Sequence, residues 1–496
     1  MTGTLYGVGL GPGDPELMTV KAARLISEAS VIAYHCARHG RSIARSVAEP
    51  YLREGQVEEK LVYPVTTETT DHPGGYEGAI ADFYELSAKR LAEHLDAGRD
   101  VVLLCEGDPF FYGSYMYMHE RLSGRFEAVV VPGVTSVSAA SAVLGRPLVQ
   151  RDEVLTVLPG TLPAPELARR LADTDAAAVL KLGRTFGSVR EAFEEAGKLD
   201  DAVFVERATW GQQRIEPLAS VDPSTVPYFS LALLPSPAYA SRVSPAPVPA
   251  LVAEGAGEVV VVGLGPAGPE WLTPEAAAEL SAAEHVVGYG PYVARVPQKA
   301  GQQRHASGNR VEADRARDAL SLAASGARVA VVSSGDPGVF AMASAVLEQV
   351  SSGHGTGVRV RIVPGVTAAQ AAASRVGAPL GHDYCVLSLS DRLKPWEIIE
   401  KRLDAAGAAD LVLALYNPAS RSRTTQLADA RNVLLRHRAP STPVVVARDV
   451  GGPEEDIRVT TLGDLDPSTV DMRCLLIVGS SKTRAENGVV WTPRSY

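Results

Sequence analysis

Short apolar runs alternate with longer amphipathic stretches along the chain. Leu5–Leu10 is apolar, Thr19–Ala29 repeats its apolar positions with the period of a helix, and Val31–Tyr34 is apolar again. A strand, a Gly/Pro turn, a helix and a second strand in this order are typical of a βαβ unit. Fully apolar runs at Val101–Cys105 and Val129–Val131 predict strands that are buried on both faces. We therefore expect a mostly parallel sheet covered by helices.

The same pattern returns in the second part of the chain. Val329–Ser333 and Val360–Val363 predict two strands of a second parallel sheet. Each sheet is followed by a further α/β region, with strands predicted at Ala178–Leu182, Ala202–Glu206, Tyr228–Leu234, Leu411–Tyr416, Pro443–Arg448 and Cys474–Val478. The predicted fold class is α/β, with four subdomains arranged as two successive pairs.

Three motifs occur twice in the same order, which explains this repetition. The first copy holds Tyr6–Thr19, Glu106–Gly113 and Val131–Ser136, and the second holds Val261–Thr273, Ser334–Ala341 and Val363–Ala368. Each copy is about 240 residues long, so the chain is a tandem duplication rather than a solenoid. Between the copies, Pro235–Pro249 contains five prolines, which is typical of a semi-rigid exposed linker. We expect one unit over residues 1–240, a linker over 236–257 and a second unit over 256–496.

Composition and charge exclude several classes of protein. The 48 Lys and Arg residues are outnumbered by 58 Asp and Glu, giving a net charge of −10, so there is no general footprint for nucleic acid or an anionic membrane. The four cysteines form no Cys-x-x-Cys pair, and neither a disulfide framework nor a metal site is indicated. No apolar run approaches the ~18 residues of a membrane span. We expect a soluble protein of the reducing cytoplasm.

The first motif has to be compared with the dinucleotide-binding fingerprint. Gly263, Gly265 and Gly268 match the Gly-x-Gly-x-x-Gly spacing between a strand and a helix. That fingerprint also needs an acidic residue ~20 positions later to hold a ribose hydroxyl. This chain has His35 there in one copy and Tyr289 in the other. A nicotinamide-dependent dehydrogenase is therefore disfavoured.

The other two motifs each have a functional and a structural interpretation. In Gly107-Asp108-Pro109 and its second copy, glycine allows a ligand to approach the backbone and the carboxylate could hold an amine or a hydroxyl. A tight turn explains the same residues. Thr135 and Thr367 follow a strand and precede a helix, where they could cap that helix or contact a ligand. The sequence leaves these alternatives open.

Taken together, in this order and spacing, the three motifs resemble those of the tetrapyrrole methyltransferase family, whose substrates are uroporphyrinogen and precorrins. The resemblance covers both halves of the chain, with one family unit in each. It implies that each unit consists of two α/β subdomains with S-adenosylmethionine bound in the cleft between them. It also implies that the Gly-rich first motif faces the tetrapyrrole.

Further segments separate the two halves. Val205–Trp210 and Pro227–Leu231 are similar to the precorrin-2 C(20)-methyltransferase branch of the family. Similarity to the precorrin-3B C(17)-methyltransferase branch is carried by Gly381–Asp391, Pro395–Glu397, Leu415–Ser420, Arg421 and Arg423. The chain thus resembles a fused bifunctional enzyme of cobalamin biosynthesis, which converts precorrin-2 to precorrin-3A and, with ring contraction, precorrin-3B to precorrin-4. The alternative within this fold is methylation of another substrate, such as a diphthamide or ribosomal RNA target.

The resemblance also implies which residues hold the cofactor. In the first half they are Pro12, Glu106, Gly107, Asp108, Phe111, Thr135, Ser136, Leu182 and Ala208. In the second half they are Pro266, Ser334, Gly335, Asp336, Val339, Thr367, Ala368, Leu415, Tyr416, Asn417 and Val450.

Catalysis should depend on orientation, because methyl transfer from a sulfonium to carbon is an in-line displacement that requires no nucleophilic side chain. His35 is a candidate for removing or carrying a proton in the first half. Ring contraction needs further proton transfers, and the second half offers one predicted polar cluster for them, namely His382, Asp383, Ser388, Ser390 and Asp391. A structural role in the core, in a turn or at a helix cap is the alternative for each.

The implied partners are small tetrapyrrole substrates, without nucleic acid or membrane. An acidic protein needs local cations to bind a polycarboxylate, and the candidates are Arg38, His39, Arg41, Arg45, Arg295, Lys299, Arg304, His305 and Arg310. Single-unit members of the family are typically homodimers, so the resemblance implies either pairing of the two halves within one chain or a homodimer.

Overall fold

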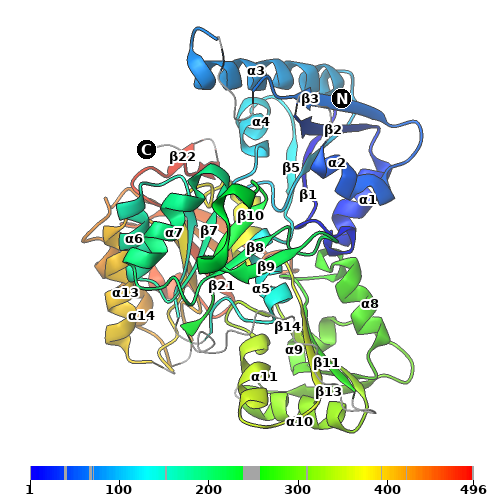
Figure 1. Cartoon of the computed structure of the whole chain (residues 1–496), viewed down its shortest axis with the longest axis vertical. Coiled ribbons are helices and arrows are strands. Elements are labelled where there is room, and N and C mark those ends of the chain that lie inside the picture. The colour runs from blue at the N-terminus through cyan, green and yellow to red at the C-terminus, as the bar shows by residue number, and fades with distance from the viewer. Residues whose placement is uncertain are drawn as a thin grey trace. The chain divides into compact units, whose positions relative to one another are not determined.

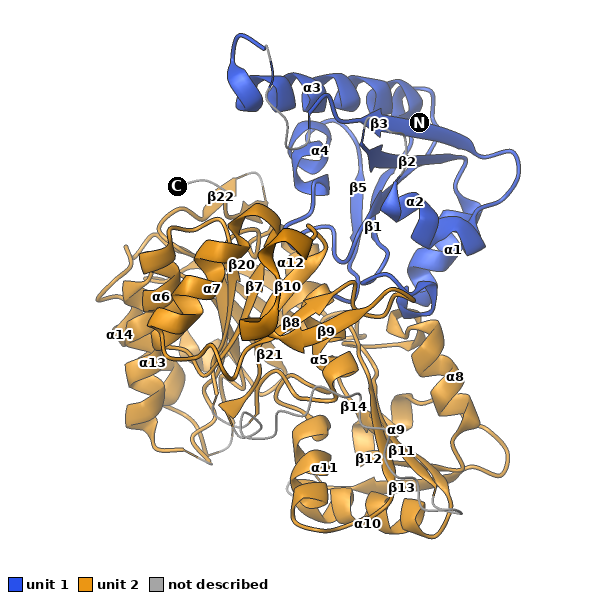
Figure 2. Cartoon of the chain, viewed as in Figure 1, with its two compact units in different colours: residues 1–135 blue, residues 136–496 orange. Residues whose placement is uncertain are grey.

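The computed structural model describes residues 2–37, 42–65, 70, 72–150, 153–237, 257–308, 311–392, 394–420, 422–486 and 488–493. These residues form two compact units, unit 1 over 1–135 and unit 2 over 136–496 (Figures 1 and 2). Residues 238–256 of the predicted linker lie outside the described residues. Among the residues that are described, no helix is long and apolar enough to cross a membrane.

Unit 1 is built on a five-stranded parallel sheet. Its strands are β1 (Leu5–Gly9), β2 (Val31–Cys36), β3 (Val57–Val62), β4 (Val101–Cys105) and β5 (Ala128–Val131), in the order β3-β2-β4-β1-β5. Its helices are α1 (Val20–Glu28), α2 (Ile43–Ala48), α3 (Gly75–Asp96) and α4 (Tyr115–Leu122). Helix α1 begins where the Thr19 hydroxyl accepts the Ala22 N–H, and Ile26 packs in one core with Val8 and Ile32 of the sheet. The predicted βαβ unit is confirmed.

Unit 2 contains a second sheet of the same design. Its strands are β11 (Glu258–Gly263), β12 (His285–Tyr289), β13 (Gln303–Ser307), β14 (Arg328–Ser333) and β15 (Arg359–Val363), in the order β13-β12-β14-β11-β15. On one face, Val259 and Val261 share a core with α10 (Glu312–Ala324) and α11 (Met342–Ser351). On the other, Val260 and Val262 share a core with α8 (Pro274–Ala282) and α9 (Gly290–Arg295). Burial on both faces explains why this strand is an unbroken apolar run.

The other main strands of both halves form one ten-stranded sheet in unit 2, in the order β20-β19-β21-β18-β17-β6-β7-β10-β8-β9. The first half supplies β6 (Leu155–Pro159), β7 (Ala176–Leu180), β8 (Val203–Glu206), β9 (Arg214–Pro217) and β10 (Ser230–Leu234). The second half supplies β17 (Tyr384–Ser388), β18 (Val412–Tyr416), β19 (Pro443–Arg448), β20 (Asp456–Thr461) and β21 (Cys474–Val478). From the centre of the sheet outward, the first half places its strands in the order β6-β7-β10-β8-β9. The second half places the corresponding strands in the order β17-β18-β21-β19-β20.

This shared sheet joins two of the four predicted subdomains, one from each half. At its centre β6 and β17 are antiparallel, with Tyr384 opposite Val157. Both strands are fully buried, and each would be an exposed edge if its half stood alone, so their pairing satisfies backbone groups that would otherwise lack partners. The two halves are therefore joined within one chain, as one of the two predicted assemblies requires.

Helices cover this sheet. In the first half α6 (Ala164–Ala172) and α7 (Phe186–Glu195) contribute to its core, and in the second half α13 (Trp396–Ala408) and α14 (Gln426–Leu434) do so. Unit 2 also contains α5 (Ser136–Leu144), α12 (Ala368–Val376) and a small sheet of β16 (Gly377–Ala378), β22 (Arg484–Glu486) and β23 (Val489–Trp491).

Candidate cofactor and catalytic sites

The three repeated motifs of the second half meet at the carboxyl end of its parallel sheet. The Gly265 N–H donates to the Gly335 carbonyl at 3.2 Å, and the Gly335 N–H donates back to Gly265 at 2.8 Å. A Cβ atom on Gly365 would lie 2.4 Å from the Gly335 carbonyl oxygen. Gly335 itself has a φ of +66°. Gly365 is therefore needed because two backbone segments approach too closely for a side chain, and Gly335 because of its positive φ.

The Asp336 carboxylate links the second motif to the third. Its Oδ1 accepts the Gly338 N–H at 2.8 Å and its Oδ2 accepts the Gly365 N–H at 3.1 Å. The side chain is buried, and this burial raises the pKa of its carboxyl to about 6, against the opposing effect of the backbone donors. Both oxygens thus take part in building the turn, which is the structural interpretation that the sequence left open.

Unit 1 repeats this arrangement. The Asp108 Oδ1 accepts the Phe110 N–H at 2.9 Å, and its Oδ2 accepts the Gly133 N–H at 3.1 Å. A Cβ atom on Gly133 would lie 2.1 Å from the Gly107 carbonyl oxygen. Burial raises the pKa of the Asp108 carboxyl to about 7. The duplication therefore extends to the hydrogen bonds that hold the motifs together.

A fourth segment joins the second-half motifs at the start of α12. The Thr367 hydroxyl caps this helix by accepting the Gln370 N–H at 3.3 Å. The Ala369 N–H donates to the Tyr416 hydroxyl at 3.2 Å, and the Tyr416 ring lies 5.5 Å from that of Phe340. Tyr416 ends β18, so the predicted Leu415–Asn417 segment lies against both the second and the third motif.

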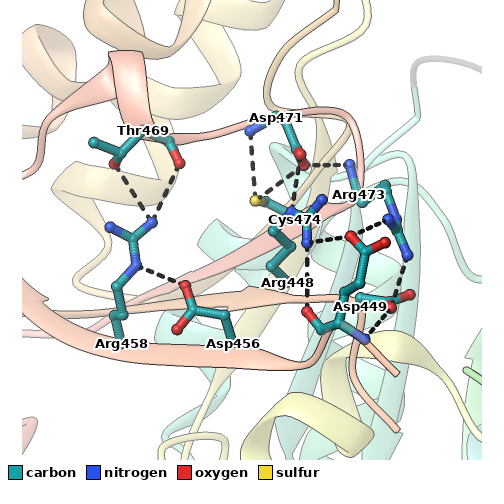
Figure 3. Close-up of polar contacts among 9 residues, drawn as sticks. Arg448, Asp449, Asp456, Arg458, Thr469, Asp471, Arg473 and Cys474 are labelled. Atoms are coloured by element: carbon teal, nitrogen blue, oxygen red, sulfur yellow. Dashed lines mark hydrogen bonds and ion pairs between the residues drawn. The ribbon is translucent and has the colours of Figure 1, made fainter. Parts of the chain in front are cut away.

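A fifth segment, the loop after β19, carries Val450. Ion pairs hold this loop: Arg473 lies 2.7 Å from Asp449 (Figure 3), and Arg448 lies 3.0 Å from Glu454. A Cβ atom on the next residue, Gly451, would lie 2.6 Å from the Trp271 indole nitrogen in the first motif. The second-half cofactor residues predicted from the family therefore lie on five segments joined by contacts.

The predicted first-half residues are divided between the units. Unit 1 holds Pro12, Glu106, Gly107, Asp108, Phe111 and Thr135, and unit 2 holds Ser136, Leu182 and Ala208. Glu106 is at the carboxyl end of β4, where its Oε1 accepts the Ala44 N–H at 3.1 Å. Leu182 and Ala208 are buried and follow β7 and β8.

His35 lies near the carboxyl end of β2 in unit 1, within an aromatic cluster. Its ring stacks on Tyr63 with 5.3 Å between centroids, and the rings of Phe83 and Tyr84 lie 6.0 and 6.2 Å away. Among the described residues, its buried Nε2 has no hydrogen-bond partner. Burial lowers the pKa of the imidazole to about 4. His35 is therefore neutral at pH 7.

The predicted polar cluster of the second half is divided between the two ends of β17. His382 and Asp383 precede the strand, and its five residues span about 17 Å at 3.3 Å per residue. Asp383 forms an ion pair with Arg170 of α6, from the first half, and its Oδ1 lies 3.5 Å from the His382 Nδ1. Burial raises the pKa of the Asp383 carboxyl, while His382 and Arg170 lower it.

The other three residues of that cluster lie at the carboxyl end of β17. Ser388 accepts a hydrogen bond from the Asn417 side chain at 3.0 Å, which connects it to the Leu415–Asn417 segment. Ser390 accepts one from Arg423 at 3.4 Å. Asp391 lies 3.6 Å from the Arg423 guanidinium. The five residues therefore do not form one cluster, and three of them lie next to the predicted cofactor segments.

Comparison with known proteins agrees with this geometry. The family described as Tetrapyrrole (Corrin/Porphyrin) Methylases matches residues 4–222 and 258–466. The chain belongs to the tetrapyrrole methylase family. It is 60% identical over 502 residues to the cobalamin biosynthesis protein CobIJ of Mycobacterium tuberculosis, covering 100% of this chain and 96% of that protein.

Single-unit relatives match about half of this tetrapyrrole methylase. A precorrin-2 C(20)-methyltransferase from Sinorhizobium sp is 51% identical over 234 residues, which cover 47% of this chain and 95% of the relative. A precorrin-3B C(17)-methyltransferase from the same source is 47% identical over 247 residues, which cover 48% of this chain and 97% of the relative.

Several of the predicted substrate-binding cations form hydrogen bonds or ion pairs with other residues of the methylase. Arg38, His39, Arg41 and Arg310, like Arg421 of the family motif, lie outside the described residues. Arg295 donates to the carbonyl oxygens of Leu264 and Gly265 at 3.1 and 2.7 Å, so it fixes the first motif. The other described candidates pair as follows: Arg45 with Glu58, Lys299 with the Ser281 carbonyl, Arg304 with three carbonyls of residues 293–297, and His305 with His285.

Sequence reasoning did not single out Arg170. This buried arginine lies on an amphipathic helix of the first half, and its partner Asp383 is 213 residues away. A charged residue at an apolar helix position is the one signal that points to it, because arginine is rarely buried without a partner.

Proposed function

We propose that this chain is a bifunctional S-adenosylmethionine-dependent methyltransferase of cobalamin biosynthesis. The first half methylates precorrin-2 at C(20) to give precorrin-3A, and the second methylates precorrin-3B at C(17) with ring contraction to precorrin-4. The observation that carries the proposal is the complete motif geometry present twice in a chain that matches CobIJ over its whole length.

The glycine-built turns are the part of each half that suits a cofactor. At Gly107 and Gly335 the backbone has positive φ; among the described residues no heavy atom lies within 4 Å of a Cβ built on Gly107, and the nearest to one on Gly335 is 3.8 Å away. A ligand can therefore approach the backbone directly. S-adenosylmethionine supplies an electrophilic methyl group. The chain orients the reactants and excludes water, and positioning alone can lower the activation free energy by ~7–11 kcal/mol.

Proton handling is assigned to different residues in the two halves. His35, neutral and with an unpartnered Nε2, is the proposed proton acceptor for C(20) methylation. For C(17) methylation Asp391 is the better placed candidate, because it lies at the same end of β17 as the cofactor segments. His382 and Asp383 stay candidates, although the Arg170 ion pair favours a structural role for Asp383.

We also propose that the enzyme works in the cytoplasm. All four cysteines, Cys36, Cys105, Cys385 and Cys474, are free and buried, which suits a reducing compartment.

Product analysis tests the proposed function. The full chain is incubated with methyl-labelled S-adenosylmethionine and either precorrin-2 or precorrin-3B, and the label is located in the product. We expect label at C(20) from the first substrate and at C(17) of a ring-contracted product from the second. Loss of label transfer to both substrates by folded protein would contradict the proposal. Selective thermal stabilisation by NAD rather than S-adenosylhomocysteine would instead favour the dehydrogenase alternative.

A further inference from the structure

The first half contributes directly to the second motif of the second half. Helix α5 and the segment after it lie against the turn over residues 335–339. The Val149 N–H points to the Gly338 carbonyl at 3.4 Å, and Val149 and Val339 form a parallel bridge. A Cβ atom on Gly338 would lie 3.2 Å from the Ser141 hydroxyl. This turn therefore packs against residues from the other half of the chain.

Ser138 makes the most specific of these contacts. Its hydroxyl hydrogen-bonds the Asp336 carboxylate. The other two donors to that carboxylate are the N–H groups of Gly338 and Gly365, which come from the second half. Ser138 and Asp336 are 3% and 4% exposed, and a carboxylate buried this deeply depends on every donor that it has.

The composition of α5 supports a specific role for this hydroxyl. The helix reads Ser-Val-Ser-Ala-Ala-Ser-Ala-Val-Leu from Ser136 to Leu144, so polar groups are few in it. Ser141 is equally buried, but its hydroxyl donates to the Arg146 carbonyl within its own half at 2.5 Å. Ser138 differs because its partner is a charged group of the opposite half.

We infer that Ser138 is a positioning residue of the second-half cofactor site. From the first half it fixes the Asp336 carboxylate and, through it, the turn over residues 335–339. This inference rests on the proposed function of that turn as part of the C(17) site. It means that the C(17) site is incomplete without the first half, although the motifs of the second half are complete in sequence.

The test compares two serine variants of the full chain. In Ser138→Ala we expect the KM for S-adenosylmethionine in C(17) methylation to rise about tenfold, the effect of losing one hydrogen bond to a charged group. Ser138→Thr, which keeps a hydroxyl, should restore most of the affinity. Ser141→Ala is the matched control, because it removes a hydroxyl of equal burial from the same helix without touching the Asp336 hydrogen bond.

The pH profile separates positioning from packing. Loss of the Ser138 donor raises the pKa of Asp336, so the acid limb of C(17) methylation should move to higher pH in Ser138→Ala and stay in place in Ser141→Ala. Tyr416 faces this carboxylate from β18, but burial raises its pKa to about 12 and it stays neutral over the range. The acid limb of C(20) methylation should not move.

A double-mutant cycle completes the test. If Ser138 acts through Asp336, Ser138→Ala should have no further effect on the C(17) KM in an Asp336→Asn background. Equal effects of Ser138→Ala in both backgrounds, or an unmoved acid limb, would overturn the inference and leave the proposed function intact. Normal C(17) kinetics in Asp336→Asn would instead overturn the assignment of the turn to the cofactor site.

Discussion

The ion pair between Arg170 and Asp383 gives a quantitative test of how the two halves are joined. Arg170 lies on α6 of the first half and Asp383 directly precedes β17 of the second, and their side chains are 6% and 0% exposed. Breaking a buried pair by removing one partner typically costs 3–5 kcal/mol, because the other charge is left buried without compensation. Arg170 keeps a contact with Glu166 at 2.7 Å, and that carboxylate is partly exposed. We therefore expect Asp383→Ala to lower the free energy of unfolding by about 3 kcal/mol, the lower end of that range.

The assay is chemical denaturation of the full chain, followed by circular dichroism. Asp314→Ala is the control, since it removes the same group from an exposed ion pair with Arg317 and should cost less than about 0.5 kcal/mol. The double variant Arg170→Met with Asp383→Leu should recover most of the lost stability, because neither charge is then buried alone. If Asp383→Ala is as stable as the control variant, the ion pair does not join the halves. If it is stable and loses C(17) turnover, Asp383 is a catalytic residue.

Three further outcomes are expected. Gly365→Ala should abolish C(17) but not C(20) methylation in product assays, because its Cβ would lie 2.4 Å from a carbonyl oxygen, whereas Gly187→Ala, with open space around it, should change neither activity. In pH–rate profiles the acid limbs of both activities should lie well above the ordinary pKa of an aspartate, because both turns need an ionised carboxylate and burial raises the pKa of Asp108 to about 7 and of Asp336 to about 6. Because burial lowers the pKa of His35 to about 4 in the folded state, the native state binds fewer protons than the unfolded state below pH 6.5. The free energy of unfolding from urea titrations should therefore fall between pH 6.5 and 4, and in His35→Phe this part of the decline should disappear.

Much of the fold was predictable from the sequence because its strands are unbroken apolar runs. Pro443–Arg448 and Cys474–Val478 were predicted residue for residue as β19 and β21. Other boundaries shifted by one or two residues, as at β7, where the strand is Ala176–Leu180. The sequence also located the repeated glycine motifs, but it assigned their glycines to ligand approach or to turns, whereas Gly133 and Gly365 are required by contacts between backbones.

The strands through which the two halves join were not predictable in the same way. β6 and β17 are short apolar runs, and nothing in such a run identifies its neighbour in a sheet. The same limit explains why the prediction of a single polar cluster was wrong. Asp383 and Ser388 are close in sequence but lie at opposite ends of a strand. Side-chain partners such as Arg170 become evident only when distant segments are brought together.

We propose that each half of the chain holds its own cofactor site, which calorimetric titration of the full chain with S-adenosylhomocysteine would measure. We expect a stoichiometry of about two per chain, because the motif geometry is complete in both copies, and about one in Gly365→Ala. A stoichiometry of one in the folded, unsubstituted chain would contradict it.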